Sequence, residues 1–171
     1  YILENTYLEK EDYEALKRYC SENLKFLDKK DFISNSGNLY IDSVVNYKAD
    51  MAEKAGIKVT ANTEVPQDAE MNAEDISICL GNLLDNAIEA AERSNDPQIT
   101  VSCRADKGLF MLRVENSLVG DEKSDLSTTK ADPTAHGFGL AGMREIAARY
   151  HGSLSAGPVN GRFELVVCLS L

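Results

Sequence analysis

The hydrophobic and polar positions of this 171-residue chain follow two different periods. Apolar residues recur at helical spacing over about residues 3–27 and again over 39–55, with charged residues between them. The polar stretch "SNSGN" separates the two segments, and Gly56 stands where a helix C-cap is expected. The first third of the chain therefore predicts two helices whose apolar faces must pack against something else.

From Ile57 onward the pattern becomes mostly an alternation that is typical of strands. Strands are predicted over 57–65, 98–105, 109–116, 152–157 and 162–171, and helices over about 73–94 and 140–150. Asp106-Lys107-Gly108 and Asn160-Gly161 are hairpin turn signals. This order predicts an α+β fold, a two-layer sandwich with helices on one face of a mixed, mostly antiparallel sheet.

Composition narrows the functional classes. The formal net charge is −10 and no stretch is rich in Lys or Arg, which argues against nucleic acid as a partner. The four cysteines form no CxxC pair, so reduced thiols are expected rather than a disulfide framework or a metal site. No apolar run approaches the ~18 residues of a membrane span. Because the chain begins at Tyr1, we expect it to be part of a longer protein.

The helix that contains "LGNLLDNAIEAAER" carries an unusual polar row. At 100° per residue, one broad face is apolar and should meet the sheet. Asn82, Asn86, Glu89 and Arg93 fall in a narrow stripe on the opposite side. Amide carbonyls are hard oxygen donors that suit Mg²⁺ while leaving room for phosphate oxygens and water. The alternative interpretation is an ordinary solvated face.

Two further stretches have features of a nucleotide site. In "HGFGLAGM", residues 136–143, three glycines lead into a helix whose N-terminus offers N–H groups to an anion. A long polar segment over 118–136 precedes it and predicts a lid, whereas a Rossmann site would need a preceding strand. Asn116 ends a predicted strand, where its carbonyl could accept a hydrogen bond from an adenine amino group or cap a turn.

In this order, "NLLDNAIEAA", "VENSLVG", the polar segment, "HGFGL" and the hairpin at Gly161 resemble the GHKL ATPases. Within that family, "YIDSVVNYKADMAEKAGIKV" and "STTK" look most like sensor histidine kinases of the peptide-quorum-sensing type. The resemblance covers about residues 39–171. It implies a Bergerat fold that binds ATP and Mg²⁺ between the asparagine helix and the lid.

The resemblance also implies roles for individual residues. Asn86 would be the principal Mg²⁺ ligand, and Asn82 would contribute to the same metal–phosphate site. Asn116 stands where the family usually has an adenine-binding Asp, and Leu118 stands where a glycine is common. The implied nucleotide contacts are Asn86, Asn116, Gly120, Lys130, His136, Gly137, Gly139, Leu140 and Gly142.

Position 82 bears on the reaction. Relatives that hydrolyse ATP carry a glutamate there, whereas Asn82 cannot act as a general base. The resemblance therefore implies a protein-histidine kinase in which positioning and charge neutralisation transfer the γ-phosphoryl to another acceptor. Neither His136 nor His151 lies on the N-terminal helices, so we expect the phosphoacceptor histidine upstream of Tyr1 and no autophosphorylation by this fragment.

We therefore expect two regions. Residues 1–56 would be the end of the dimerisation and phosphotransfer region, and residues 57–171 the catalytic domain. The implied partners are the upstream histidine helix, a response regulator and, in the full-length protein, a second copy. The implied location is a cytoplasmic domain of a membrane-anchored parent. Two alternatives stay open: a serine kinase of the anti-sigma type, and a non-catalytic interaction module on the same fold that has kept nucleotide binding.

Overall fold

The computed structural model describes residues 10, 12–15, 18, 32–66, 69, 72–118 and 133–171, with the side chains of 133–138 left out. It divides the chain into two compact units, Tyr1–Phe32 and Ile33–Leu171. In the first unit, residues 13–15 are helical, and the backbone N–H of Ala15 donates to Asp12 Oδ1 at 3.0 Å. Most of the helix predicted over 3–27 lies outside the described residues.

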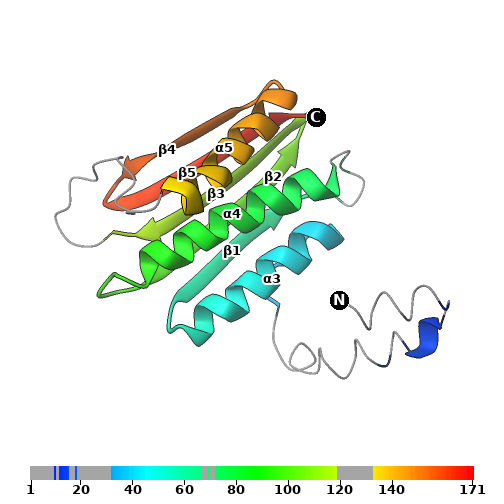
Figure 1. Cartoon of the computed structure of the whole chain (residues 1–171), viewed down its shortest axis with the longest axis horizontal. Helices are drawn as coiled ribbons and strands as arrows, with labels where there is room; N and C mark the ends of the chain where they lie inside the picture. Colours follow the sequence, from blue (N-terminus) through cyan, green and yellow to red (C-terminus); the bar gives the residue numbers. More distant parts are fainter. Residues whose placement is uncertain are drawn as a thin grey trace. The chain divides into compact units, whose positions relative to one another are not determined.

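The second unit is built on a five-stranded sheet (Figure 1). Its strands are β1 (Lys58–Glu64), β2 (Gln98–Asp106), β3 (Leu109–Ser117), β4 (Ser153–Val159) and β5 (Arg162–Ser170). The spatial order is β1-β2-β3-β5-β4, with β1 and β2 parallel and every other neighbouring pair antiparallel. A parallel pair requires a crossover connection, and a helix supplies it here. The predicted mixed, mostly antiparallel sheet is confirmed.

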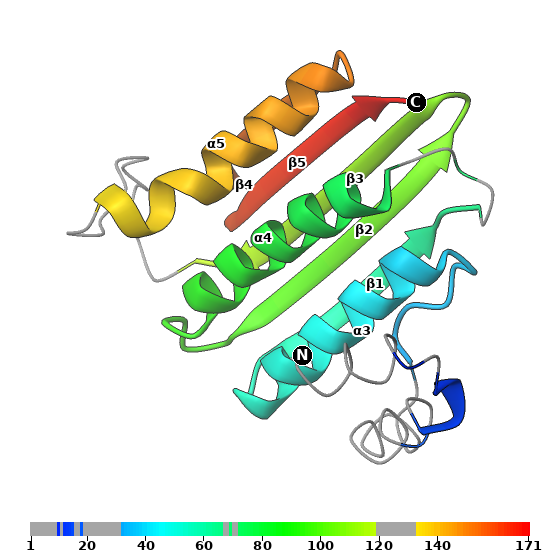
Figure 2. The ribbon, with the colours of Figure 1, turned by 45° about the vertical axis from the view of Figure 1, so that its right-hand side comes forward.

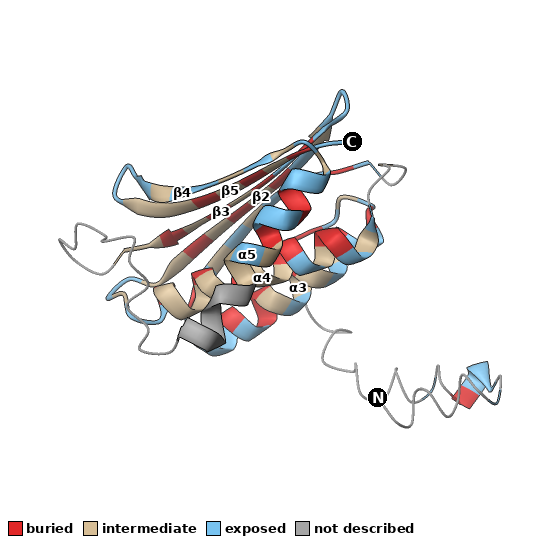
Figure 3. Cartoon of the chain, turned by 45° about the horizontal axis from the view of Figure 1, so that its top comes forward, coloured by how far each residue is buried: buried red, intermediate tan, exposed pale blue. Residues whose placement is uncertain are grey.

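Three helices cover one face of this sheet: α3 (Leu39–Lys54), α4 (Ala73–Ala91) and α5 (Pro133–Arg149) (Figure 2). In the central strands, alternate residues face the helices and are almost fully buried, as in β3, where the buried positions are Phe110, Leu112, Val114 and Asn116. Figure 3 colours the buried residues of strands and helices red. The two-layer α+β sandwich predicted from the sequence is therefore confirmed.

Local sequence signals account for the element ends. Asn38 caps α3 by accepting from the N–H of Ile41, and Asn72 caps α4 by accepting from Glu74 and Asp75. The β4–β5 turn has positive φ at both Asn160 (52°) and Gly161 (80°), which is the geometry that an Asn-Gly hairpin turn favours. None of the helices in the described part of the chain is long and apolar enough to cross a membrane.

Two boundaries differ from the sequence-based expectation. Helix α5 begins at Pro133, not near Leu140. Proline is well suited to the first turn of a helix, so a helix can start there. The glycines that follow lower the helix propensity by only about 1 kcal/mol each, so they do not prevent the helix from continuing. The compact unit begins at Ile33, so α3 lies in the same unit as the sheet, although the expected boundary follows residue 56. Ile41, Val45 and Ala52 of α3 belong to the common core with the sheet.

Candidate functional site

Helix α4 presents its apolar face to the sheet. The residues on that face are each exposed by 2% or less: Ile76, Leu80, Leu83, Leu84, Ala87 and Ala91. This confirms the helix orientation predicted from the pattern. Asn82 and Asn86 therefore project away from the sheet, and both are half-buried. Further along the row, Arg93 Nη2 lies 3.0 Å from Glu89 Oε1, so these two charges pair with each other.

The side chain of Asn82 is held in one orientation. Its Nδ2 donates to the carbonyl oxygen of Ile78 at 2.8 Å, one turn earlier in α4. Its Oδ1 faces α5, because a Cβ built on Gly139 would lie only 3.3 Å from that oxygen. The hydrogen bond occupies the donor end of the amide, so the carbonyl end is presented where the two helices meet. The structure thus brings together one residue of the asparagine row and one glycine of "HGFGLAGM".

Asn116 lies near the end of β3 and faces the helix layer, with 2% of its surface exposed. Its Nδ2 donates to the carbonyl oxygen of Ser117 at 2.9 Å. This local hydrogen bond resembles the turn cap considered from the sequence, and it uses only the donor end of the amide. Ser94 Oγ, just beyond α4, donates to the carbonyl oxygen of Leu118 at 3.4 Å. The end of α4 and the strand end that carries Asn116 are therefore neighbours.

The structure describes the remaining candidate residues only in part. Gly120 and Lys130 lie outside the described residues. His136 and Gly137 lie within α5, where only the backbone is described. Leu140 and Gly142 are half-buried, and a Cβ on Gly142 would meet no atom within 4 Å.

One buried charge cluster escaped the sequence analysis. Asp75, in the first turn of α4, is 7% exposed and accepts two hydrogen bonds from the end of α5. Arg149 Nη2 lies 2.6 Å from its Oδ1, and the Tyr150 hydroxyl donates to its Oδ2 at 3.1 Å. Local patterns in the sequence do not indicate this cluster, because the partners of Asp75 are 74 and 75 residues away. The one indication in the sequence that Asp75 is buried was its position beside Ile76, at the edge of the apolar face of α4.

This cluster changes two pKa values. Burial and the hydrogen bond to Asp75 raise the pKa of the Tyr150 hydroxyl, which therefore stays protonated at neutral pH and can act as a donor. Burial, and then the charge of Asp75, raises the pKa of the Cys79 thiol to about 11. A thiol with such a pKa is largely un-ionised at neutral pH, so Cys79 is a structural residue and not a nucleophile.

Solved structures with this arrangement of helices and strands include catalytic domains of histidine kinases. The catalytic domain of the histidine kinase ThkA is 23% identical, with a TM-score of 0.61 over 78% of this chain and 92% of that chain. Full-length ShkA in complex with AMPPNP is 17% identical, with a TM-score of 0.58 over 76% and 29%. The blue-light activated histidine kinase EL346 of Erythrobacter litoralis is 16% identical, with a TM-score of 0.58 over 94% and 50%.

The family comparison covers the part of the chain that carries the site. No curated protein matches the chain. The family model described as "GHKL domain" matches residues 71–170, from just before α4 to the end of β5. That range contains the asparagine row, Asn116 and the glycine stretch in the order noted in the sequence. The chain therefore belongs to the GHKL domain family, and its fold is that of histidine kinase catalytic domains.

Proposed function

We propose that this chain is the ATP-binding catalytic domain of a sensor histidine kinase, which transfers the γ-phosphoryl group of ATP to a histidine outside residues 1–171. The observation that carries the proposal is the close approach of Gly139 to the Asn82 amide, where a Cβ added at Gly139 would lie 3.3 Å from Oδ1. It places the glycine stretch, whose backbone N–H groups suit phosphate, next to the amide row, whose oxygens suit a metal ion. The recorded complex of ShkA with AMPPNP, an ATP analogue, supports the same assignment.

The residues of the row fit a magnesium ion. Asn82 and Asn86 are one helical turn apart on the side of α4 that faces away from the sheet, and Asn82 presents its carbonyl oxygen there. Mg²⁺ favours a few protein oxygens together with phosphate oxygens and water. When bound, the ion would neutralise charge on the triphosphate. Asn82 supplies an oxygen but cannot remove a proton from water, so hydrolysis should be slow and transfer to another acceptor favoured.

Asn116 is our candidate for the adenine contact. An adenine amino group is a donor and needs an acceptor. Because Nδ2 of Asn116 is bonded to the Ser117 carbonyl, Oδ1 is the end of the amide that remains to accept. An amide in this orientation can replace the aspartate that is usual at this position. We further propose backbone contacts to phosphate at Gly137, Gly139, Leu140 and Gly142, and side-chain contacts from Lys130 and His136.

Finer features of the assignment are also proposals. We infer a peptide-quorum-sensing subtype, a response regulator as the phosphate acceptor after histidine, and a dimeric, membrane-anchored parent protein. Residues 1–32, the first compact unit, would connect the domain that includes α3 to the phosphoacceptor helix. A serine kinase of the anti-sigma type is the competing assignment, and the identity of the phosphorylated residue separates the two.

Calorimetric titration of the chain with ATP, with and without Mg²⁺, tests the proposal. We expect Mg-ATP to bind and to raise the melting temperature, since a ligand that binds only the folded state stabilises it. Asn86→Ala should abolish the Mg²⁺-dependent part of the affinity and leave the unfolding free energy nearly unchanged, because Asn86 lies outside the core. Asp85→Asn, on the exposed adjoining position, is the matched control.

Three outcomes would contradict the proposal. If neither ATP nor Mg-ATP binds the wild type, the chain is not an ATP-binding catalytic domain. If Asn86→Ala binds Mg-ATP as tightly as the wild type does, the metal ligand is misassigned. If the longer protein carries label from γ-labelled ATP on serine and not on histidine, the kinase class is wrong.

A further inference from the structure

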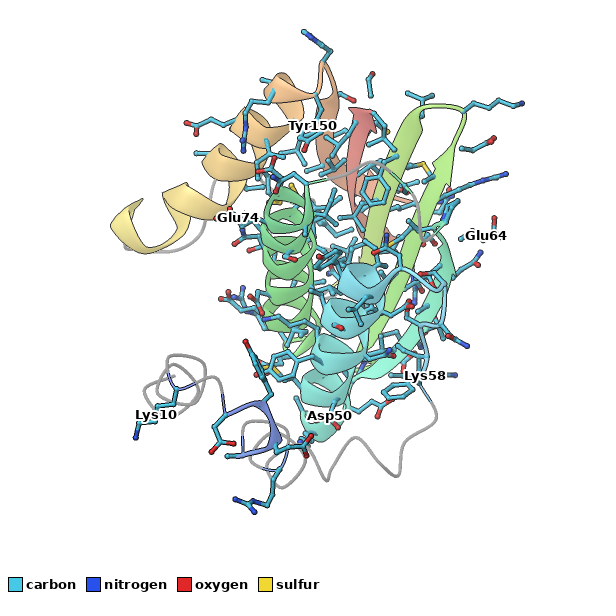
Figure 4. All side chains as sticks on the ribbon, turned by 90° about the vertical axis from the view of Figure 1, so that its right-hand side faces the viewer. Lys10, Asp50, Lys58, Glu64, Glu74 and Tyr150 are labelled. Atoms are coloured by element: carbon cyan, nitrogen blue, oxygen red, sulfur yellow. The ribbon has the colours of Figure 1, made fainter. Side chains whose placement is uncertain are left out.

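One buried carboxylate of the described residues pairs with two side chains away from the candidate site. In the Asp75 cluster (Asp75, Arg149 and Tyr150), the carboxylate at the start of α4 accepts from two side chains at the end of α5. Figure 4 shows Tyr150 at the end of α5, close to the first turn of α4 where Glu74 is labelled. Both carboxylate oxygens are occupied, which is what a buried carboxylate requires. The cluster therefore joins the two helices at one defined point.

Helices α4 and α5 run antiparallel. The first turn of α4 meets the last turn of α5 at the Asp75 cluster, and two turns further along α4, Asn82 meets Gly139. The distance along α4 between these two points is about 10 Å at 1.5 Å per residue. One end of α5 is thus fixed by charge and hydrogen bonds, and the other end carries the glycine stretch.

The contacts between these two points are apolar. Met143, Ile146 and Ala147 of α5 are buried in the core with Cys79 and Leu80 of α4. Apolar burial is not directional, so it holds α5 against the neighbouring elements without specifying its axial position closely. An ion pair and a hydrogen bond to separate oxygens of one carboxylate are directional. The Asp75 cluster is therefore a directional contact that fixes the end of α5 against α4, while the hydrogen bond from the Ser170 N–H to the Tyr150 carbonyl oxygen at 3.0 Å ties the same end to β5.

We propose, on the basis of the proposed function, that Asp75 is a positioning residue for the Mg-nucleotide site. Through Arg149 and Tyr150 it sets the axial position of α5 so that Gly139 lies against the Asn82 carbonyl. A small axial shift of α5 would separate these two groups. The raised pKa of Tyr150 fits this role, because the hydroxyl keeps its proton and continues to donate.

The chain offers a matched control for this proposal. On another side of α4, Lys48 Nζ of α3 lies 2.5 Å from Asp85 Oδ1. This ion pair also anchors a helix to α4, and it involves no atom of α5. Breaking it should affect the packing of α3 without moving the glycine stretch.

The experiment is calorimetric titration of the chain with Mg-ATP. Arg149→Gln and Asp75→Asn should each weaken binding about fivefold, the lower end of the usual coupling between separate sites. Arg149→Lys should bind like the wild type, because an ammonium can also reach one carboxylate oxygen. Asp85→Asn should leave the affinity unchanged. The Arg149 side chain is 62% exposed, so its replacement leaves no core cavity and the variant should fold.

Hydrogen exchange without nucleotide gives a second readout that does not depend on ATP binding. Arg149→Gln should speed exchange of the α5 amides around residues 139–143, while the amides of β2 and β3 stay protected. The positioning role is overturned if exchange in α5 is unchanged, if Arg149→Gln keeps wild-type affinity, or if Asp85→Asn weakens binding equally. A wild type that binds no Mg-ATP would instead refute the proposed function, and the exchange result would still decide whether the cluster positions α5.

Discussion

Gly139→Ala separates the nucleotide site from the stability of the fold. The substitution adds one methyl group to α5, and its Cβ would lie 3.3 Å from Asn82 Oδ1 and 3.7 Å from Asn82 Cγ. The first of these distances is shorter than most Cβ contacts, so the Asn82 amide must move by a few tenths of an ångström. That amide is held by its hydrogen bond to the Ile78 carbonyl, and moving it strains this bond.

The expected magnitudes follow from two opposing contributions. Alanine in place of glycine within a helix raises the unfolding free energy by about 1 kcal/mol. Forcing a side chain off its rotamer costs about 0.5–1.5 kcal/mol. The two nearly cancel, so the stability of Gly139→Ala should stay close to that of the wild type. A displaced oxygen loses an interaction with a charged ligand, typically ~1.5–3 kcal/mol, which weakens Mg-ATP binding roughly tenfold or more.

Urea denaturation and calorimetric titration of the same protein samples measure the two effects. Gly81→Ala on α4 is the control, because a Cβ there meets no atom within 4 Å. It should gain about 1 kcal/mol of stability from helix propensity and keep its affinity for Mg-ATP. If Gly139→Ala shows the same gain and the same affinity as this control, Asn82 and Gly139 are not in functional contact and the reasoning fails.

Two further predictions concern stability alone. Gly152→Ala should lower the unfolding free energy by about 3 kcal/mol or more, because its Cβ would lie 2.0 Å from the Cys168 carbonyl oxygen, which is backbone and cannot rotate away. Gly157→Ala, with no atom within 4 Å, is its control in urea denaturation, and equal effects of the two would contradict this account. The second prediction concerns Asp42. Burial opposes its ionisation, but hydrogen bonds from Ser34, Ser36 and Gly37 lower its pKa below 3.8. The stability it contributes is therefore present above that pH and is lost as the pH falls through the lower, folded-state pKa. Asp42→Asn should flatten the fall of the urea midpoint below about pH 4, and an unchanged slope would count against these hydrogen bonds.

The sequence by itself determined the elements and the orientation of α4. The six apolar positions of that helix are buried as their spacing predicts, because a helix at 100° per residue fixes which side chains share a face. The hairpin turns and the Asn72 cap are also local, since each depends on residues within a few positions of one another. The order of the asparagine row, Asn116 and the glycine stretch was sufficient to indicate the family.

Only the tertiary structure decided what these elements meet. The Asp75 cluster joins residues 74 and 75 positions apart, and no periodicity specifies such a pair. The place of α3 in the core follows from packing, because its buried side chains need the apolar partners that the rest of the unit supplies. The orientations of the Asn82 and Asn116 amides depend on which carbonyl each one reaches. An amide can present either a donor or an acceptor, so its chemistry is settled by its three-dimensional neighbours and not by its position in the sequence.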